Sequence, residues 1–193
     1  DAECSGDLGV NSACNYLGLF FVLSGVGTSG SDHETYLAST LSASTATWEI
    51  CSWHKNQQLM QVGEKIDETG WEVYDTCRAA GAIIATAHEH SYSRTYLLSD
   101  FENQTISSTS STLEIEAGAS FAFVSGLGGK TIRAQNDTLA ANEWWASVYT
   151  ETQSANYGAL FCTFFRHSVE NRASCYFKDV DGNIPDQFDL IKR

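Results

Sequence analysis

Hydrophobic positions in the first half of the chain form short runs that alternate with amphipathic segments. The apolar runs over 17–24 and 82–86 have the length and composition of buried strands. The segment 47–54 alternates apolar and polar side chains, as a half-buried strand does. Apolar residues at helical spacing follow Glu34 and recur over 67–80. Strand and helix in repetition predict βαβ units, with parallel strands and helices packed on the sheet.

Local signals indicate where the two helices begin and end. Ser31 and Glu34 have the S-x-x-E spacing of a capping box, in which the two side chains bond backbone N–H groups of the first turn. Such a cap explains Asp32 and His33 without a metal site or an acid–base pair. Gly81 is expected to end the second helix, because glycine readily adopts the left-handed conformation of a helix C-terminus.

After Thr95 the pattern changes to short strands separated by turns. The first fifteen residues are rich in Gly, Ser and Asn, which predicts irregular structure there unless a disulfide bridge fixes them. The segment 139–147 is a candidate for a short helix, and Asp181-Gly182 is expected to turn a hairpin. The expected strands of this half cover 96–98, 112–116, 121–124, 157–165, 174–180 and 187–191.

Six cysteines and two sequons indicate the compartment. Cysteines that are neighbours along the chain could close three local loops, although six cysteines allow other connectivities. The candidate pairs are Cys4 with Cys14, Cys51 with Cys77, and Cys162 with Cys175. Asn103 and Asn136 begin N-x-[ST] acceptor sites for N-glycosylation. Together these features predict a secreted, extracellular protein, the alternative being six buried thiols in a cytosolic one.

Length and composition favour one compact domain, since 193 residues of which 42% are apolar suffice for a sizeable core. We expect a single α/β domain over 1–193, made of a disulfide-closed segment (1–16), a βαβ part (17–95) and a β-rich part (96–193). The net charge of −13 disfavours nucleic acid and anionic membranes as partners, because both would repel this surface. No apolar run has the length of a membrane span and no signal-peptide pattern opens the chain, so Asp1 is expected to be a mature or cut end.

Histidines follow two of the predicted strands. His54 ends the strand over 47–54, and His88 and His90 follow the strand over 82–86. Neutral imidazole is a common metal ligand, and the carboxyl ends of parallel strands meet at the edge where open α/β sheets bind ligands. We therefore expect these imidazoles to share one metal site. For H-x-H alone, a polar loop is the alternative.

Three other segments have both a functional and a structural interpretation. Ser125–Gly129 could wrap an anion with its backbone N–H groups, but no helix pattern follows it and we expect a tight turn. Asp179–Asn183 resembles part of a calcium loop that lacks its final glutamate, so a turn is expected there too. Trp144 and Trp145 could form a sugar- or partner-binding platform, and burial against the sheet is the preferred interpretation.

The histidine segments resemble a known family. The resemblance rests on CSWHKNQ at 51–57, GAIIATAHEHSYSRT at 81–95 and FVSGLGG at 123–129. These segments look like the C-terminal half of a calcineurin-like metallophosphoesterase, and H-x-H-x-Y-x-R is similar to the version of the purple acid phosphatase branch. The resemblance implies half of a metallophosphoesterase β-sandwich, with βαβ units followed by a mainly antiparallel region.

In that family two metal ions bind the phosphate and activate a water or hydroxide for in-line attack. By resemblance, His54 and His88 would bind one divalent ion (Zn, Fe or Mn) and His90 the other, while Tyr92 and Arg94 would support the site or the structure. The family's D-x-H and G-N-H-[DE] motifs are absent from this sequence, and Gly6-Asp7 lies in a Cys-flanked loop without the strand that a metal-binding G-D would follow. In the family, the first half supplies the bridging carboxylate and the proton donor. No catalytic residue is therefore assigned.

Two hypotheses for function follow. The first is a secreted metal-dependent phosphoesterase region that hydrolyses phosphate esters only when a missing N-terminal half, as a separate chain, completes it. Without that half, the three imidazoles could hold one Zn²⁺ but could not build a two-metal centre, so metal occupancy and enzymatic activity stay open. The alternative is a non-catalytic secreted glycoprotein that uses the half-fold for binding or self-assembly, because a half-sandwich exposes a sheet edge and an apolar face.

Overall fold

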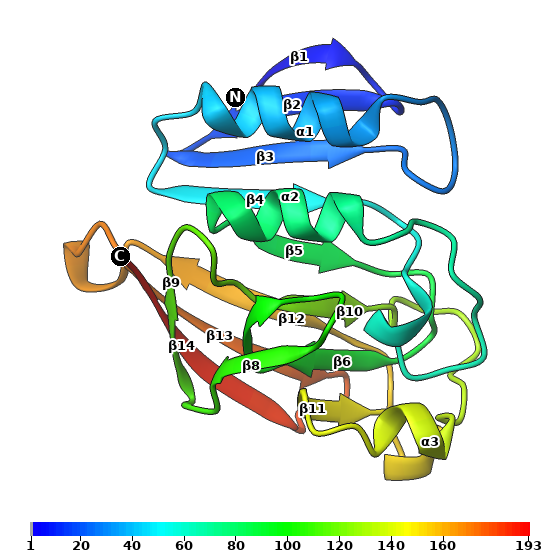
Figure 1. Cartoon of the computed structure of the whole chain (residues 1–193). Helices are drawn as coiled ribbons and strands as arrows, with labels where there is room; N and C mark the ends of the chain where they lie inside the picture. Colours follow the sequence, from blue (N-terminus) through cyan, green and yellow to red (C-terminus); the bar gives the residue numbers. More distant parts are fainter. Residues whose placement is uncertain (1) are drawn as a thin grey trace.

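Two sheets, one of them covered by helices, form the framework of residues 2–193, which the computed structural model describes (Figure 1). Asp1, the expected mature or cut end, lies outside the described residues. The first sheet has eight strands in the order β1-β2-β3-β4-β5-β10-β6-β11. Their bounds, in that order, are Glu3–Asp7, Asn11–Tyr16, Leu19–Ser24, Trp48–Ser52, Ile83–Thr86, Ala122–Ser125, Tyr92–Thr95 and Trp145–Tyr149.

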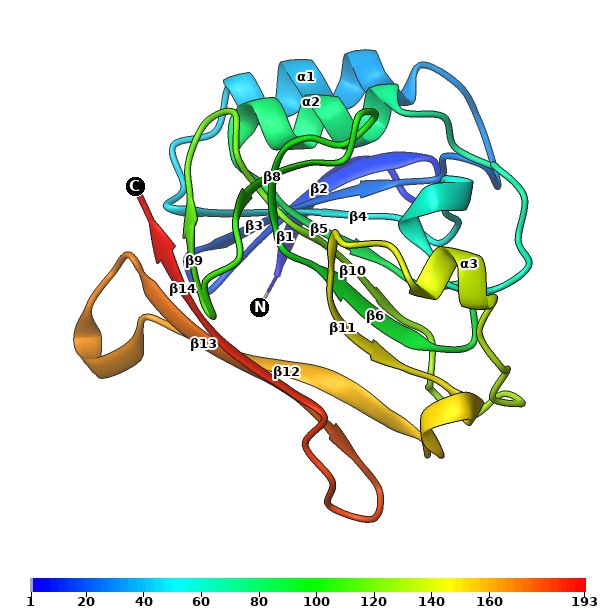
Figure 2. The same ribbon diagram turned by 60° about the horizontal axis from the view of Figure 1, so that its bottom comes forward.

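The predicted βαβ units form the centre of this sheet. Strands β3, β4, β5 and β10 are parallel neighbours, which confirms the α/β class. Helices α1 (His33–Ser42) and α2 (Glu72–Ala80) cover one face, and the second sheet covers part of the other (Figure 2). A short third helix, α3 (Asp137–Ala140), lies near β11. No helix within residues 2–193 is long and apolar enough to cross a membrane.

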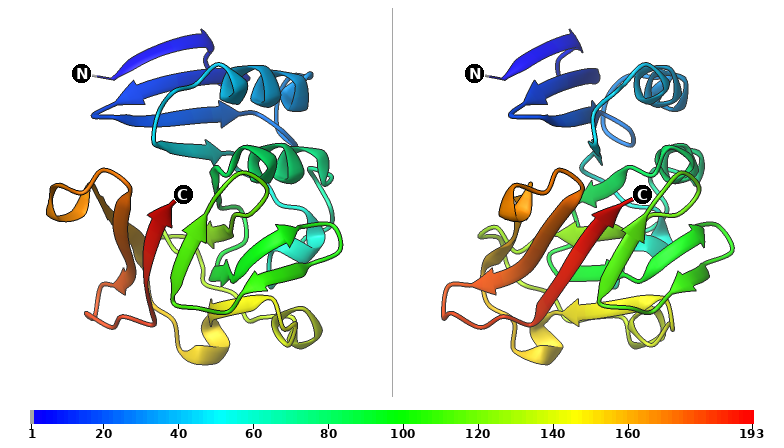
Figure 3. Two further views of the ribbon diagram at one scale, coloured as in Figure 1. Left: turned by 60° about the vertical axis from the view of Figure 1, so that its left-hand side comes forward. Right: turned by 90° about the vertical axis from the view of Figure 1, so that its left-hand side faces the viewer.

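The second sheet has four strands in the order β12-β13-β14-β9, and β7 and β8 form a separate pair. The β13–β14 hairpin turns at Asp181-Gly182, as predicted. Figure 3 shows that β1–β3 project beyond the second sheet, whose strand β12 is an unpaired edge. The bounds are β12 (Gly158–Phe164), β13 (Arg172–Asp179), β14 (Asp186–Lys192), β9 (Thr112–Ile115), β7 (Leu97–Asp100) and β8 (Thr105–Ser108).

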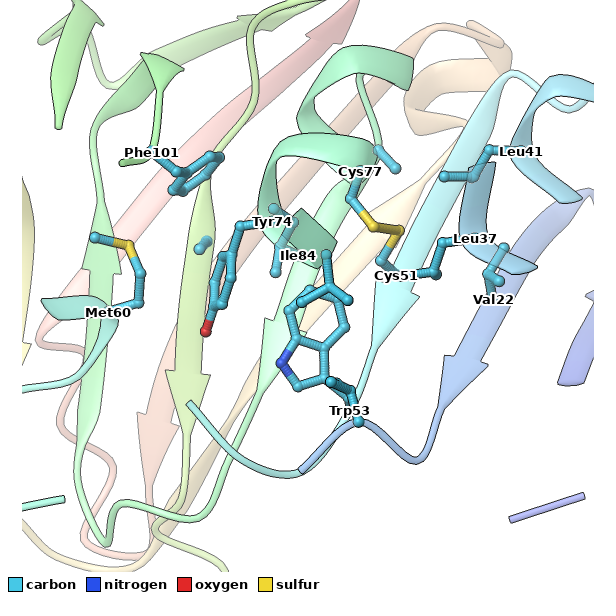
Figure 4. Packing of buried hydrophobic residues seen from close by; sticks show 14 of the residues in the cluster. Val22, Leu37, Leu41, Cys51, Trp53, Met60, Tyr74, Cys77, Ile84 and Phe101 are labelled. Carbon is cyan, nitrogen blue, oxygen red and sulfur yellow. A yellow bond between two sulfur atoms is a disulfide. The ribbon is translucent and has the colours of Figure 1, made fainter. Parts of the chain in front are cut away.

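The core has one layer on each face of the first sheet. Figure 4 shows the layer beneath the helices, where Leu37 of α1 and Tyr74 of α2 pack toward Val22 and Ile84 of the strands. The Cys51–Cys77 disulfide lies in this layer and joins β4 to α2. The layer between the sheets includes residues of the opposite strand parity, such as Ile50, because successive side chains of a strand point to opposite faces. All three expected disulfide pairings are confirmed.

Both predicted helices begin later than expected. No capping box forms at α1: Ser31 Oγ donates to Asp32 at 2.8 Å, and Asp32 is the N-cap residue in the left-handed conformation, without a side-chain cap bond. In 67–71 the Asp67 carboxylate accepts the N–H groups of Thr69 and Gly70, at 3.1 and 2.9 Å. This local turn competes with helix formation, so α2 starts only at Glu72.

The rest of the chain differs from the expectations at three places. The first fifteen residues, expected to be irregular unless a bridge fixes them, contain the Cys4–Cys14 bridge and form the β1–β2 hairpin. The strand expected over 96–98 begins one residue later, because Tyr96 lies between β6 and β7 and β7 covers Leu97–Asp100. In 139–147 the helix ends early and β11 begins at Trp145, since strand β6 offers a pairing edge that the local sequence does not reveal.

Candidate functional site

Parallel pairing brings two of the histidines together. Backbone bonds continue past the ends of β4 and β5, with Trp53 N–H donating to Ala85 O and Ala87 N–H donating to His54 O, each at 3.2 Å. His88 then adopts the left-handed conformation, with φ of 59°. As a result, His88 Nδ1 and His54 Nε2 lie 3.1 Å apart, and the two rings meet edge to face.

Glu68, an acidic residue that the sequence analysis did not single out, contacts the ring nitrogen of His88 that faces away from His54. Glu68 Oε2 lies 3.0 Å from His88 Nε2, and Glu68 Oε1 accepts a hydrogen bond from Lys55 at 2.5 Å. Burial raises the pKa of Glu68, but the Lys55 hydrogen bond and the His88 charge outweigh it and lower the pKa overall. Burial, together with the nearby Lys65 charge, lowers the pKa of His88. A carboxylate behind an imidazole is the usual way to fix the orientation of a ligating histidine.

His90 lies at the same pocket with a partner of its own. Its Nδ1 is 2.7 Å from Thr131 O, so this nitrogen carries the proton and Nε2 is left as the basic nitrogen. A shallow pocket of about 280 Å³ joins the three imidazoles to the loop after β10. It is lined by His54, Ala87, His88, His90, Ser125, Gly126, Gly128 and Lys130.

The histidines of this pocket could supply some of the ligands of a metal site but not a complete set. Two nitrogen ligands of a tetrahedral Zn²⁺ stand roughly 3.3 Å apart at ordinary Zn–N distances, so the His54–His88 spacing of 3.1 Å suits two ligands of one ion. Among residues 2–193, however, no three His, Cys, Asp or Glu side chains form a group that could hold an ion. A two-metal centre therefore does not fit the residues of this chain alone.

Glu89, between the two histidines of H-x-H, is a buried structural residue that sequence reasoning missed. Its carboxylate accepts the N–H of His90 at 3.1 Å and pairs with Arg133 at 3.3 Å. Gly63 and Gly126 pack directly against it: a Cβ at Gly126 would lie 1.8 Å from Glu89 O. Only glycine allows the loop after β10 to come so close to the histidine turn.

Tyr92 and Arg94 contact a different partner. Arg94 binds the Asp186 carboxylate through two nitrogens, at 2.7 and 2.8 Å, and Tyr92 donates to the same carboxylate at 2.5 Å. The Arg94 guanidinium also lies 4.0 Å from the centre of the Phe188 ring. This buried cluster ties β6 of the first sheet to β14 of the second, which favours a structural role over support of the histidines.

The two sequons differ in their surroundings. Asn103 is exposed, and its side chain donates to Asp100 at 3.0 Å. Asn136 is half-buried; its carbonyl caps α3 at the N–H of Leu139, and its amide donates to Glu64. Glycosylation of either residue stays a prediction.

The Asp179–Asn183 segment and the Trp144-Trp145 pair make contacts that favour their structural interpretations. The carboxylate of Asp179 accepts the N–H groups of Asp181 and Asn183, so Asp179–Asn183 is the expected turn. Trp145 is 9% exposed, and its indole N–H donates to Leu139 O, whereas Trp144 is partly buried against the helix-side core.

Comparison with known proteins bears on the fold. No family model matches the chain, and no curated protein matches it. A purple acid phosphatase from yellow lupin (Lupinus luteus) seeds superimposes with a TM-score of 0.76 at 15% identity, covering 94% of this chain and 32% of the phosphatase. The structure of PhoD gives a TM-score of 0.48 at 15% identity, covering 91% of this chain and 44% of that one. The chain thus spans about a third of the lupin enzyme, and it shares the fold of that part of the enzyme.

Proposed function

We propose that this chain is the histidine-bearing C-terminal half of a secreted, metal-dependent phosphoesterase. The observation that supports it best is the meeting of His54 and His88 at the carboxyl edge of parallel strands, 3.1 Å apart. The three disulfides are compatible with an oxidising, extracellular compartment.

The residues of this chain would share the work of holding the metals. His54 and His88 would hold one ion with Glu68 orienting His88, and His90 would offer Nε2 to the other. Bound divalent metals would supply Lewis-acid activation of the phosphate ester. The carboxylates and the proton donor would come from an N-terminal half outside these 193 residues, because they contain no D-x-H or G-N-H-[DE] motif.

Metal binding to histidine variants tests the proposal. We expect His88→Ala to weaken Zn²⁺ affinity at least tenfold in calorimetric titration, since it removes one of two converging nitrogens. His167→Ala is the matched control, because His167 is an exposed histidine on a loop of the second sheet. Equal Zn²⁺ affinity for the wild type and His88→Ala would contradict the assignment.

Activity requires a second measurement. Phosphate-ester turnover should be undetectable for this chain alone with Zn²⁺, Fe or Mn²⁺, and should arise when an N-terminal half that carries the missing motifs is added. The same mixture with His88→Ala should be inactive. Turnover that does not respond to this substitution would refute a role for the pocket.

The free edge of the second sheet favours a second candidate, a non-catalytic secreted glycoprotein that binds a partner or itself. Strand β12 reads GALFCTF, without a charge or a proline, and so lacks the features that protect natural edge strands. On its outer face Phe161, 50% exposed, stacks on Tyr176 with ring centres 5.6 Å apart. Such an edge offers backbone pairing and aromatic contact to another strand.

Light scattering separates the two candidates. If β12 mediates assembly, Phe161→Lys should reduce the mass at high concentration to that of one chain. Val180→Lys is the control, because Val180 is 70% exposed and lies outside the strand. A metal-free assembly that Phe161→Lys disrupts would support the second candidate, and a metal-binding single chain would support the first.

A further inference from the structure

We infer that the inter-helix cleft, which lies between α1 and α2, binds a small aliphatic ammonium compound through the carboxylate of Glu49. The two helices lie side by side on the helix-covered face of the first sheet (Figure 1). The cleft is separate from the histidine pocket, because Glu49 is the second residue of β4 and His54 follows the other end of that strand. The inference therefore does not depend on the proposed function.

Glu49 is a buried carboxylate without a partner. Its neighbours Trp48 and Ile50 pack between the two sheets, so the Glu49 side chain points to the opposite face and lines the cleft. Glu49 is 8% exposed, and among residues 2–193 its carboxylate has no ion-pair or hydrogen-bond partner. Burying an unpaired charge is costly, and buried carboxylates are normally paired. A cation bound in the cleft would supply the missing partner.

Lys192 interacts with Glu49 only at longer range. Its Nζ donates to Gly81 O at 2.6 Å, and Lys192 does not line the cleft. Burial lowers the pKa of Lys192, while the Glu49 charge opposes this shift. Lys192 therefore offsets part of the Glu49 charge and leaves the cleft open to a second cation.

The walls of the cleft suit an alkyl chain that ends in an ammonium group. Ala38 and Leu41 of α1 and Ala79 of α2 offer apolar contacts to the chain. The Ser42 hydroxyl, which also lines the cleft, donates to Ser39 O at 2.9 Å, so its lone pairs can accept an ammonium N–H. The cleft volume of about 510 Å³ lies within the range of small-molecule sites.

The ends of both helices favour a positive ligand. Ser42 is the last residue of α1 and Ala80 the last of α2, and both line the cleft. Helix C-termini carry partial negative charge, and the last turn of α1 has no basic side chain to neutralise it. The net charge of −13 also attracts cations.

An inorganic divalent ion is a poorer match than an ammonium group. Such ions require several oxygen ligands, and within residues 2–193 no three His, Cys, Asp or Glu side chains form a group that could hold one. An ammonium group needs one carboxylate and a few neutral acceptors, which the cleft offers.

Titration of n-butylammonium chloride into isotope-labelled protein at fixed ionic strength tests the inference by NMR. We expect saturable shifts of the backbone amides at the C-terminal ends of α1 and α2. Glu49→Gln should weaken the binding about tenfold, the effect of losing a charge-assisted hydrogen bond. Glu34→Gln is the matched control, because Glu34 is an exposed glutamate in the first turn of α1, and it should leave the affinity unchanged.

Two further comparisons distinguish the cleft from a general attraction of cations to an acidic protein. Methylammonium should bind about tenfold more weakly than n-butylammonium, because it removes less apolar surface from water. Ala38→Leu should weaken n-butylammonium binding at least about fivefold by filling the cleft. Since Ala38 is exposed on α1, this variant should keep the circular dichroism spectrum of the wild type, and it provides a test if Glu49→Gln does not fold.

Any of five outcomes would overturn the inference. They are the absence of saturable binding, equal affinities of Glu49→Gln and Glu34→Gln, equal affinities for the two ammonium ions, unchanged binding by Ala38→Leu, and displacement of n-butylammonium by Ca²⁺ at equal ionic strength. The last outcome would assign the cleft to an inorganic cation. None of them would alter the Zn²⁺ affinity expected at His54 and His88.

Discussion

Asp186 joins the two sheets through hydrogen bonds to Tyr92 and Arg94, and all three side chains are buried. Asp186→Ala should therefore lower the free energy of unfolding by about 3–5 kcal/mol in urea denaturation, because it leaves a buried guanidinium unpaired. Asp189→Ala removes the partner of Arg166 at an exposed pair and should cost at most ~1 kcal/mol. Similar costs for both variants would contradict this account.

The same cluster predicts the alkaline behaviour of the protein. Burial and the Asp186 charge raise the pKa of Tyr92 well above its ordinary value of 10.0. The unfolded tyrosine ionises first as pH rises, so this contribution to stability is complete below pH 10.0 and is lost above it. We expect Tyr92→Phe to flatten the decline of the unfolding free energy above that pH. Tyr157→Phe, at a residue 38% exposed, should leave the decline unchanged.

At the scale of elements, the loop after β10 provides a matched pair of glycines. Gly126→Ala would place a methyl group 1.8 Å from Glu89 O, whereas Gly128→Ala would meet no atom within 4 Å. Gly126→Ala should lower the free energy of unfolding by about 1–3 kcal/mol, and Gly128→Ala by at most ~0.5 kcal/mol, in thermal denaturation. Equal effects would show that the loop does not press on the histidine turn.

The disulfides allow a further comparison between elements. Cys51–Cys77 joins β4 to α2 across 26 residues, whereas Cys4–Cys14 joins neighbouring strands across 10. Replacing Cys51 and Cys77 with Ala should cost about 3–4 kcal/mol in denaturant unfolding, and more than the same change at Cys4 and Cys14, because the loop is longer and both thiols are fully buried. The reverse order would contradict this ranking.

Elements with strong periodicity were predictable from the sequence, and those defined by a distant partner were not. The apolar run that contains β3 and the alternation in β4 both predicted strands. However, β3 is mostly half-buried, and β4 is buried on both faces because the helices and the second sheet cover it. The pairing of β1 with β2 depends on a register that Gly- and Ser-rich sequence does not specify, although Cys4 opposite Cys14 fixes it. Likewise β11 exists because β6 lies beside it.

At the scale of the whole molecule, the meeting of His54 and His88 could be predicted because parallel strands end at one edge. The position of Glu68 beside His88 could not, because Glu68 lies in a loop that no short motif connects to the histidines. The α/β class was also predictable from the sequence. How much of a larger enzyme this chain corresponds to could be learned only by comparison: it aligns with 32% of the lupin phosphatase.

Each of the three disulfides lies within one part of the protein. Cys4–Cys14 lies in the first sheet, Cys51–Cys77 joins that sheet to a helix, and Cys162–Cys175 lies in the second sheet. All six cysteines are thereby used, so no disulfide joins the two sheets. Under mechanical load or mild denaturant, the two sheets should separate from each other first, while the disulfides hold each sheet together.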